Sequence, residues 1–123
     1  MTMTTNARLQ LRPHVPTEPA SHPVEVFQNN TLRPVLKLQH DLLLQLFMHF
    51  AAKRKFFPAQ TAKDQRYAKV KELIARDNRL RGLLFGLIIG QFTSEELTYY
   101  CANEAEMNRR LTTLITQRLL SSL

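Results

Sequence analysis

Apolar side chains recur at helical spacing from residue 31 to residue 55. They form one stripe with i, i+3, i+4 and i+7 spacing, made of Leu32, Val35, Leu36, Leu42, Leu43, Leu46, Phe47 and Phe50. This spacing predicts one long amphipathic helix with Thr31 as its N-cap. Gln39 interrupts the stripe, and it is either a buried polar anchor or a sign that the helical register is drawn wrongly. Leu44 and Met48 lie roughly opposite the stripe, so the helix is either central or shared with a partner chain.

Capping residues mark where the next helices begin. Ser21 is expected to cap a short helix that starts at Pro23 and ends before Asn29. Thr61 is expected to cap a helix over about 62–77, after which the pattern changes and a further helix leads through the apolar run that ends at residue 90. The inner face of the 62–77 helix is predicted to consist of Tyr67, Val70, Leu73 and Ile74.

Two capping boxes are predicted in the last third of the chain. Thr93 is followed three residues later by Glu96, and Asn103 is followed three residues later by Glu106. The expected helices therefore cover 94–102 and 104–121. The inner face of the final helix is predicted to consist of Met107, Leu111, Leu114, Ile115 and Leu119.

These patterns together predict one all-α domain. We expect a compact bundle of four to six helices over residues 23–123, preceded by a flexible, disordered arm over residues 1–22. The competing interpretation makes 83–89 a buried strand. No other segment alternates at period two, so such a strand would need a second chain to pair with.

The three glycines of the chain fall four residues apart, at Gly82, Gly86 and Gly90, within an apolar run. On a helix they share one face, because each step of four residues advances about 40° past a full turn. A glycine in a helix interior costs about 1 kcal/mol relative to alanine, so three of them indicate compensation by a closely approaching backbone. We expect this face to pack against another helix, either within the chain or across a dimer axis, with Leu44 and Met48 as further oligomer contacts.

The net charge of +7 lies entirely in residues 53–81, which hold ten basic and three acidic residues. Three aromatic residues, Phe56, Phe57 and Tyr67, are interleaved with the basic ones, a combination that suits a nucleic-acid backbone, an acidic protein or lipid headgroups. A solvated helix face is the alternative, and no nucleic-acid-binding motif is present. The candidate phosphate contacts are Lys53, Arg54, Lys55, Lys63, Arg66, Lys69, Arg76 and Arg79, with Phe56 or Phe57 stacking on bases.

No pattern in the sequence indicates a metal site, a cofactor or a catalytic group. His40 and His49 are nine residues apart on one predicted helix and so face opposite sides, while His14 and His22 lie in the arm. The glycine spacing matches no phosphate-binding loop. Cys101 has no histidine nearby in sequence and is expected to be a small buried hydrophobic residue. The acidic residues in the first turns of predicted helices are accounted for by capping: Glu95, Glu96, Glu104 and Glu106.

The single cysteine favours a reducing compartment. The residues from Met1 to Arg12 contain no apolar segment of the kind that secretory signals carry. The longest apolar run, 83–89, is far shorter than the roughly 20 residues that a membrane-spanning helix needs. We therefore expect a cytoplasmic protein without a membrane span.

Three stretches of the chain carry a family resemblance. The first runs from Pro23 through Lys53 and contains Val-Glu-Val-Phe-Gln-Asn-Asn-Thr-Leu-Arg-Pro-Val-Leu-Lys-Leu-Gln, and the others are Gly90-Gln-Phe-Thr-Ser-Glu-Glu-Leu and Asn108-Arg109-Arg110. Over residues 23–121 they resemble a family of short, uncharacterised bacterial proteins, some of which carry the label glyoxalase. The resemblance implies a small helical domain of unknown role. A metal-chelating βαβββ glyoxalase has strands and a convergent His and Glu set, which this sequence does not predict, so no catalytic residue is carried over.

Three functions follow as hypotheses. The leading one is a non-catalytic helical interaction module that self-associates, most simply as a two-fold homodimer. The alternative is a nucleic-acid-binding accessory protein that uses residues 53–81, and an acidic protein is a further partner for the same surface. The third is an enzyme of the lactoylglutathione-lyase type, for which the sequence supplies neither a catalytic residue nor an identifiable small-molecule substrate.

Overall fold

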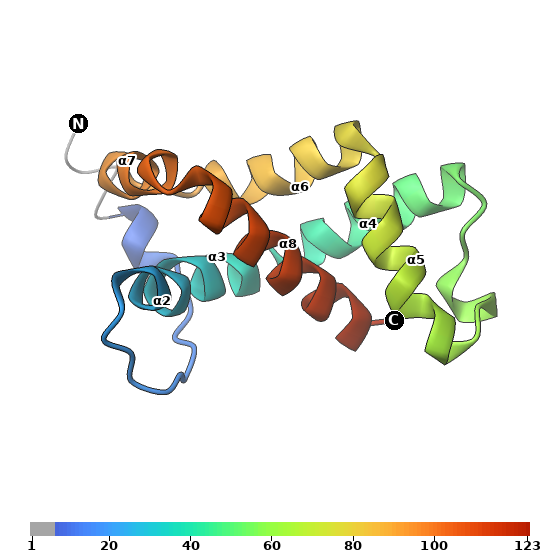
Figure 1. Ribbon diagram of the computed structural model, residues 1–123, viewed down its shortest axis with the longest axis horizontal. Coiled ribbons are helices and arrows are strands. Elements are labelled where there is room, and N and C mark those ends of the chain that lie inside the picture. Colours follow the sequence, from blue (N-terminus) through green and yellow to red (C-terminus); the bar gives the residue numbers. More distant parts are fainter. Residues whose placement is uncertain (1–6) are drawn as a thin grey trace.

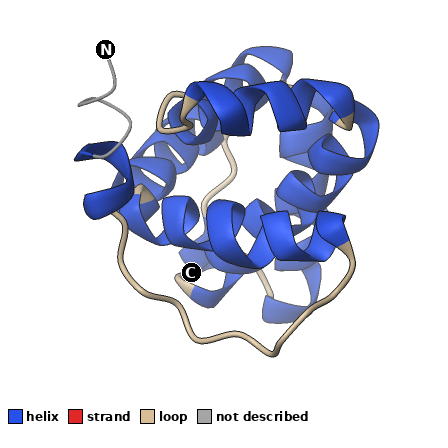
Figure 2. Cartoon of the chain, turned by 90° about the vertical axis from the view of Figure 1, so that its left-hand side faces the viewer, coloured by secondary structure: helices blue, strands red, loops and turns tan. Residues whose placement is uncertain are grey.

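The computed structural model describes residues 7–123, and within them the fold is all-α, as the sequence predicts. Helices account for all the regular structure of this range, and no strand occurs in it (Figure 2). The α-helices from residue 23 onward are α2 (Pro23–Phe27), α3 (Arg33–Leu38), α4 (His40–Lys53), α5 (Lys63–Arg76), α6 (Asn78–Ile89), α7 (Ser94–Ala102) and α8 (Glu104–Ser121). Because 83–89 lies inside α6, the alternative of a buried strand is wrong.

The helices pack around one hydrophobic core. In Figure 1, α5 stands at one end of the molecule, α2 and α7 lie at the other, and α8 crosses between the two ends. α4 packs on α6, and α8 packs on α4, α5 and α7. The largest fully buried side chains are Phe47, Leu32, Leu36, Leu43, Ile74, Leu80, Leu84, Ile88, Met107, Leu111, Ile115 and Leu119. The inner face that the sequence predicts for α8 is therefore confirmed.

The long helix predicted from Thr31 is divided, which brings the number of α-helices over residues 23–121 to seven instead of the four to six expected for the domain. The division falls at Gln39, whose backbone leaves the helical region (φ −95°, ψ 9°) between α3 and α4. Its side-chain Nε2 donates to the Leu87 carbonyl of α6 at 2.9 Å. Gln39 is thus a half-buried polar anchor between two helices, and it also marks the point at which the single stripe drawn through 31–55 changes register.

The helix starting at Pro23 does not end before Asn29. A π-helix, η1 (Gln28–Leu32), continues from α2 into α3, so Thr31 lies inside a continuous helical segment and is not an N-cap. Thr31 is buried there, and its Oγ1 donates to the Glu96 carboxylate at 3.0 Å. The Thr31 hydroxyl thus bonds a residue 65 positions away in sequence instead of capping a nearby backbone N–H. No local sequence pattern predicts this partner.

Of the helix caps that the sequence predicts, the structure confirms the one at Thr93. Thr93 and Glu96 form the expected reciprocal capping box at the start of α7. Asn103 makes no capping bond and donates to the Tyr99 carbonyl of the preceding helix instead. Thr61 also makes no cap, because α5 begins later and the Thr61 hydroxyl donates to the Phe57 carbonyl. A short 3-10 helix, η2 (Pro58–Gln60), fills that connection.

The N-terminal arm is docked on the helical domain over the part that the structure describes. Residues 7–10 form a helical turn, and the chain then loops out before α2 (Figure 1). Arg8 donates to the Phe92 carbonyl at 2.7 Å, and Arg12 makes two 2.7 Å hydrogen bonds to Glu96. Arg8 and Arg12 thus attach the start of the described chain to the helical domain, and the flexible arm expected over 1–22 stays a prediction; residues 1–6 lie outside the described range. His22, and not Ser21, caps α2 through its Nδ1.

Helices long and apolar enough to cross a bilayer do not occur among residues 7–123.

Candidate functional site

The glycine face, formed by Gly82, Gly86 and Gly90, points away from the core. The buried residues of α6 are Leu80, Leu84 and Ile88. Each glycine lies two residues, or about 200° around the helix, beyond one of these buried positions. All three glycines are exposed, and a Cβ added to Gly82 or Gly86 meets nothing within 4 Å. The expected close helix crossing within the chain is therefore wrong, and a crossing between two chains stays a prediction.

The three glycines differ in what accounts for them. Gly90 ends α6, and a Cβ built there would lie 2.9 Å from the carbonyl oxygen of Gly86, so the helix end itself favours glycine. Gly82 and Gly86 have no such neighbour, and no glycine of the described chain has a positive φ. Neither backbone conformation nor packing within the chain explains Gly82 and Gly86.

The other expected oligomer contacts lie on α4. Leu44 is partly buried and packs against the core, whereas Met48 is 39% exposed. Leu42, which the sequence assigns to the inner stripe of this helix, is also an exposed apolar side chain. The turn of the chain at Gln39 changes the register of α4 relative to α3, so a single stripe drawn through both helices places Leu42 on the wrong side.

The tertiary structure gathers five cations at the α5 end of the molecule. We call this group the basic corner: Lys53, Arg54, Lys69, Arg76 and Arg79. Arg54, Lys69 and Arg76 line a pocket of about 240 Å³ together with Phe56 and Leu73. Lys53 Nζ and Arg79 Cζ both lie over the Phe50 ring, 5.2 and 5.9 Å from its centroid. Cations that are up to 26 residues apart in sequence thus share one surface.

Two carboxylates partly neutralise the basic corner. Asp77 accepts from the Leu80 N–H at 3.0 Å, which caps α6, and from Arg54 at 3.2 Å. The Leu80 hydrogen bond, opposed by burial and aided by Arg54, holds the pKa of Asp77 below its ordinary value. Glu72 pairs with Arg76 at 3.4 Å on the exposed side of α5. Among the described residues, Lys53, Lys69 and Arg79 form no ion pair.

Several expected polyanion contacts lie outside the basic corner. Lys63 and Arg66 belong to the first turn of α5, and Arg66 donates to the Thr61 and Leu123 carbonyls, so Arg66 has a structural role. Lys55 is exposed directly after the end of α4, with a φ of 57° that side chains other than glycine rarely adopt.

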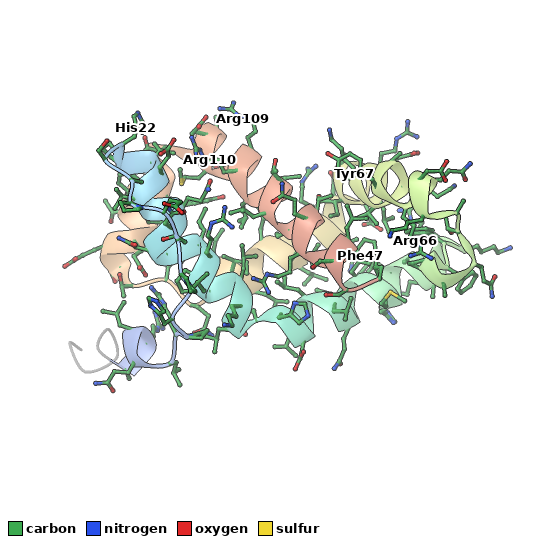
Figure 3. The ribbon with its side chains drawn as sticks, turned by 90° about the horizontal axis from the view of Figure 1, so that it is seen from below. His22, Phe47, Arg66, Tyr67, Arg109 and Arg110 are labelled. Carbon is green, nitrogen blue, oxygen red and sulfur yellow. The ribbon has the colours of Figure 1, made fainter. Side chains whose placement is uncertain are left out.

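Of the two aromatic side chains expected to stack on bases, Phe57 is exposed and Phe56 is not. Phe56 is partly buried against the core, and its ring and that of Phe47 form a T-shaped pair with centroids 6.3 Å apart, so Phe56 serves packing within the chain. Phe57 is 46% exposed, as stacking requires. Tyr67, which the sequence places on the inner face of α5, is 52% exposed on that helix (Figure 3).

Candidate metal and catalytic residues remain apart. The described residues contain no group of three His, Cys, Asp or Glu side chains that is close enough to hold a metal ion. Cys101 is exposed, so the prediction of a buried cysteine is wrong. Glu96 caps α7 as expected, whereas Glu106 bonds Arg109 and Arg110 instead of capping α8.

Two clusters that the sequence does not predict depend on contacts across the fold. One is the Arg12–Glu96 pair, whose side chains are 5% and 16% exposed. The other places Arg33 of α3 beside Arg118 of α8, next to His40. The local signal for the second cluster is the spacing of Arg118 from the buried Leu114 and Ile115, which puts it at the edge of the buried face of α8. Nothing local reveals its partner on α3.

Comparison of the chain with protein-family models, curated proteins and solved structures finds no match.

Proposed function

We propose that this protein is a non-catalytic interaction module that pairs with a second copy of itself through the glycine face of α6. The observation that carries the proposal is the open space around Gly82 and Gly86 in the middle of a 12-residue helix. A helix interior favours alanine over glycine by about 1 kcal/mol at each position. With no neighbour inside the chain to exclude a methyl group, a second backbone is the remaining reason for both glycines.

A second copy of the chain is the partner that suits this face best. Small residues four apart let two helix backbones approach closely, and two identical stripes can meet across a two-fold axis. The exposed apolar side chain of Leu83 lies beside the glycines on α6 and would be covered by the same contact.

The test uses substitutions whose effects on folding and on association have opposite signs. Gly82→Ala with Gly86→Ala raises the helical propensity of α6, so the isolated chain should gain up to about 2 kcal/mol in its free energy of unfolding. The added methyl groups separate the two backbones, so sedimentation equilibrium should give a weaker dimer. Unfolding is measured by denaturant titration at concentrations where the chain is monomeric.

A matched pair of variants distinguishes this specific contact from non-specific hydrophobic association. Gly86→Leu should abolish the dimer, whereas Ala68→Leu places the same bulk on an exposed position of α5 and should leave it intact. A wild-type chain that stays monomeric at the highest concentration reached, or a dimer indifferent to Gly86→Leu, overturns the proposal.

A second candidate function, single-stranded nucleic-acid binding, is favoured by the exposed aromatic side chains of the basic segment 53–81. Phe57 and Tyr67 are the aromatic members of the exposed large hydrophobic residues, and both belong to the basic segment 53–81. Cations that follow a phosphate backbone together with exposed rings that stack on bases are the usual means of holding a single strand.

The corresponding test is binding of a fluorescent single-stranded oligonucleotide at several salt concentrations. Lys69→Gln and Arg79→Gln should each lower the log–log salt slope by about 0.7, while the matched Lys37→Gln on α3 should not. Tyr67→Ala should weaken single-strand binding by about 1–3 kcal/mol and leave duplex binding unchanged. Binding that is absent at low salt, or equally affected by Lys37→Gln, removes this candidate.

A further inference from the structure

Two arginines from opposite parts of the chain share one pocket. Arg33 at the start of α3 and Arg118 near the end of α8 line a pocket of about 250 Å³. The amide of Gln117 and the hydroxyl of Ser121 also line it, while Leu36 and Leu114 close its apolar side. We call this site the arginine pocket. It uses no residue of the glycine face or of the basic corner.

The arginine pocket lacks a negative charge. None of the ion pairs among the described residues includes Arg33 or Arg118. Arg33 uses its Nε to donate to the Asn29 side chain at 3.3 Å, and Arg118 Nη1 lies 3.4 Å from His40 Nδ1. Each guanidinium therefore retains N–H donors that these contacts do not use, because arginine carries five of them.

The two positive charges are close enough to affect one another. Burial, and then the neighbouring charge of Arg33, lower the pKa of Arg118 below its ordinary value. Both side chains are only partly exposed. Holding two like charges together in partly buried positions is unfavourable unless an anion lies between them.

We propose that the arginine pocket binds a phosphate group, either as inorganic phosphate or as the phosphate of a small phosphomonoester. Guanidinium groups match the spacing of phosphate oxygens through two parallel hydrogen bonds, and two of them balance the charge of a dianion. Gln117 and Ser121 add neutral hydrogen-bonding groups at the rim. The volume of the pocket leaves room for a small organic group attached to the phosphate.

The test measures thermal stability and binding heat with the full chain. Inorganic phosphate and glycerol phosphate are compared with sodium chloride at equal ionic strength, because a ligand that binds only the folded state raises the melting temperature. A shift with both ligands identifies a free-phosphate site, and a shift with glycerol phosphate alone identifies a phosphomonoester site. No shift beyond that of sodium chloride overturns the proposal.

Variants distinguish a binding role from a structural one. Arg118→Gln should raise the melting temperature without ligand, because it removes the repulsion, and should lower phosphate affinity about tenfold or more. Arg33→Gln should do the same from the other helix, so the proposal does not depend on one variant folding. Arg109→Gln, an exposed arginine at the other end of α8, removes the same charge and should leave affinity unchanged (Figure 3). Equal affinity in all three variants contradicts the arginine pocket.

Discussion

Arg12 and Arg54 each bond a carboxylate that also caps a helix, but they do so at opposite ends of the molecule. At the α7 end, Arg12 is 5% exposed and bonds Glu96 at 2.7 Å; at the α5 end, Arg54 is 59% exposed and bonds Asp77 at 3.2 Å. Arg12 also donates to the Gln91 carbonyl, so its guanidinium is held on several sides. An arginine–carboxylate pair is thus a buried contact within the fold at one end and part of an exposed basic surface at the other.

This contrast shows that burial, and not charge alone, separates structural cations from cations that can meet a partner. An ion pair withdrawn from water is expensive to break, because the remaining charge is left without solvent. An exposed pair contributes little and its members are easily drawn to another ligand. The seven basic residues outside 53–81 therefore include Arg12, whose buried contact with Glu96 the net charge does not reveal.

The largest expected effect comes from breaking the buried pair. Arg12→Ala should lower the free energy of unfolding by about 3–5 kcal/mol, because it leaves the Glu96 carboxylate without its partner. The exposed Glu72–Arg76 pair of α5 is the control. Glu72→Ala should change the free energy of unfolding by less than about 1 kcal/mol. Denaturant unfolding followed by circular dichroism measures both. Equal losses in the two variants would contradict the distinction between the two regions.

Acid should weaken both regions with the same sign. Burial raises the pKa of Glu96, but hydrogen bonds from Arg12, Thr93 and Thr31 outweigh burial and hold this pKa below its ordinary value of 4.5. The hydrogen bond from the Leu80 N–H holds the pKa of Asp77 below its ordinary value of 3.8. Because the folded pKa values lie below the unfolded ones, this stability is complete above pH 4.5 and is lost as the pH falls through the folded values.

The measurement is the urea midpoint between about pH 7 and pH 3, with Glu96→Gln as the comparison. The midpoint of the wild-type chain should fall on acidification, and that of Glu96→Gln should fall less, because this variant has lost one of the two carboxylates. A midpoint that rises in acid contradicts the assignment.

At the basic corner, the capping role of Asp77 should be separable from its charge. Asp77→Ala removes the acceptor for the Leu80 N–H and should cost about 1–2 kcal/mol of stability. Asp77→Asn retains an acceptor and should cost a few tenths of a kcal/mol, since asparagine caps about as well. Thermal unfolding of the two variants checks this order. A stability loss in Asp77→Asn as large as that in Asp77→Ala would mean that the ion pair with Arg54, and not the cap, accounts for the contribution of Asp77.

The smallest expected effect concerns the backbone strain at Lys55, on the exposed side of the molecule. Lys55 follows α4 with a φ of 57°, where glycine avoids the clash that a Cβ causes. Lys55→Gly should therefore stabilise the chain by about 0.5–1 kcal/mol while removing one cation from the surface beside the basic corner. Differential scanning calorimetry measures the gain. A destabilised variant would show that the lysine side chain packs in a way that outweighs backbone strain.

The sequence predicted best what is decided within one or two turns of helix. The final two helices, the Thr93–Glu96 capping box and the inner face of α8 follow from spacing that is nearly independent of the rest of the fold. Thr61 and Asn103 also look like caps, yet they bond other backbone carbonyls. Caps compete with such alternatives at similar energy, so a local signature is weaker where another acceptor lies close.

The candidate surfaces were predicted less well, because a pattern identifies a face without identifying what covers it. The sequence places the three glycines on one face of a helix, and α6 confirms that arrangement. It leaves open whether that face packs within the chain or across a dimer axis, and the structure turns Gly82 and Gly86 toward solvent. The basic segment was located, but its division between the basic corner and the structural bonds of Arg66 depends on where α4, α5 and α6 meet.

By itself, the sequence determined that this chain is helical, which side of most helices carries the apolar residues, and where the net charge lies. Only the tertiary structure decided that Arg12 reaches Glu96, that Gln39 anchors α4 to α6 and that Arg33 stands beside Arg118. The physical reason is distance along the chain. Helical periodicity fixes the relation between residues three or four apart, whereas these partners, 48 to 85 residues apart, meet only because the core brings their helices together.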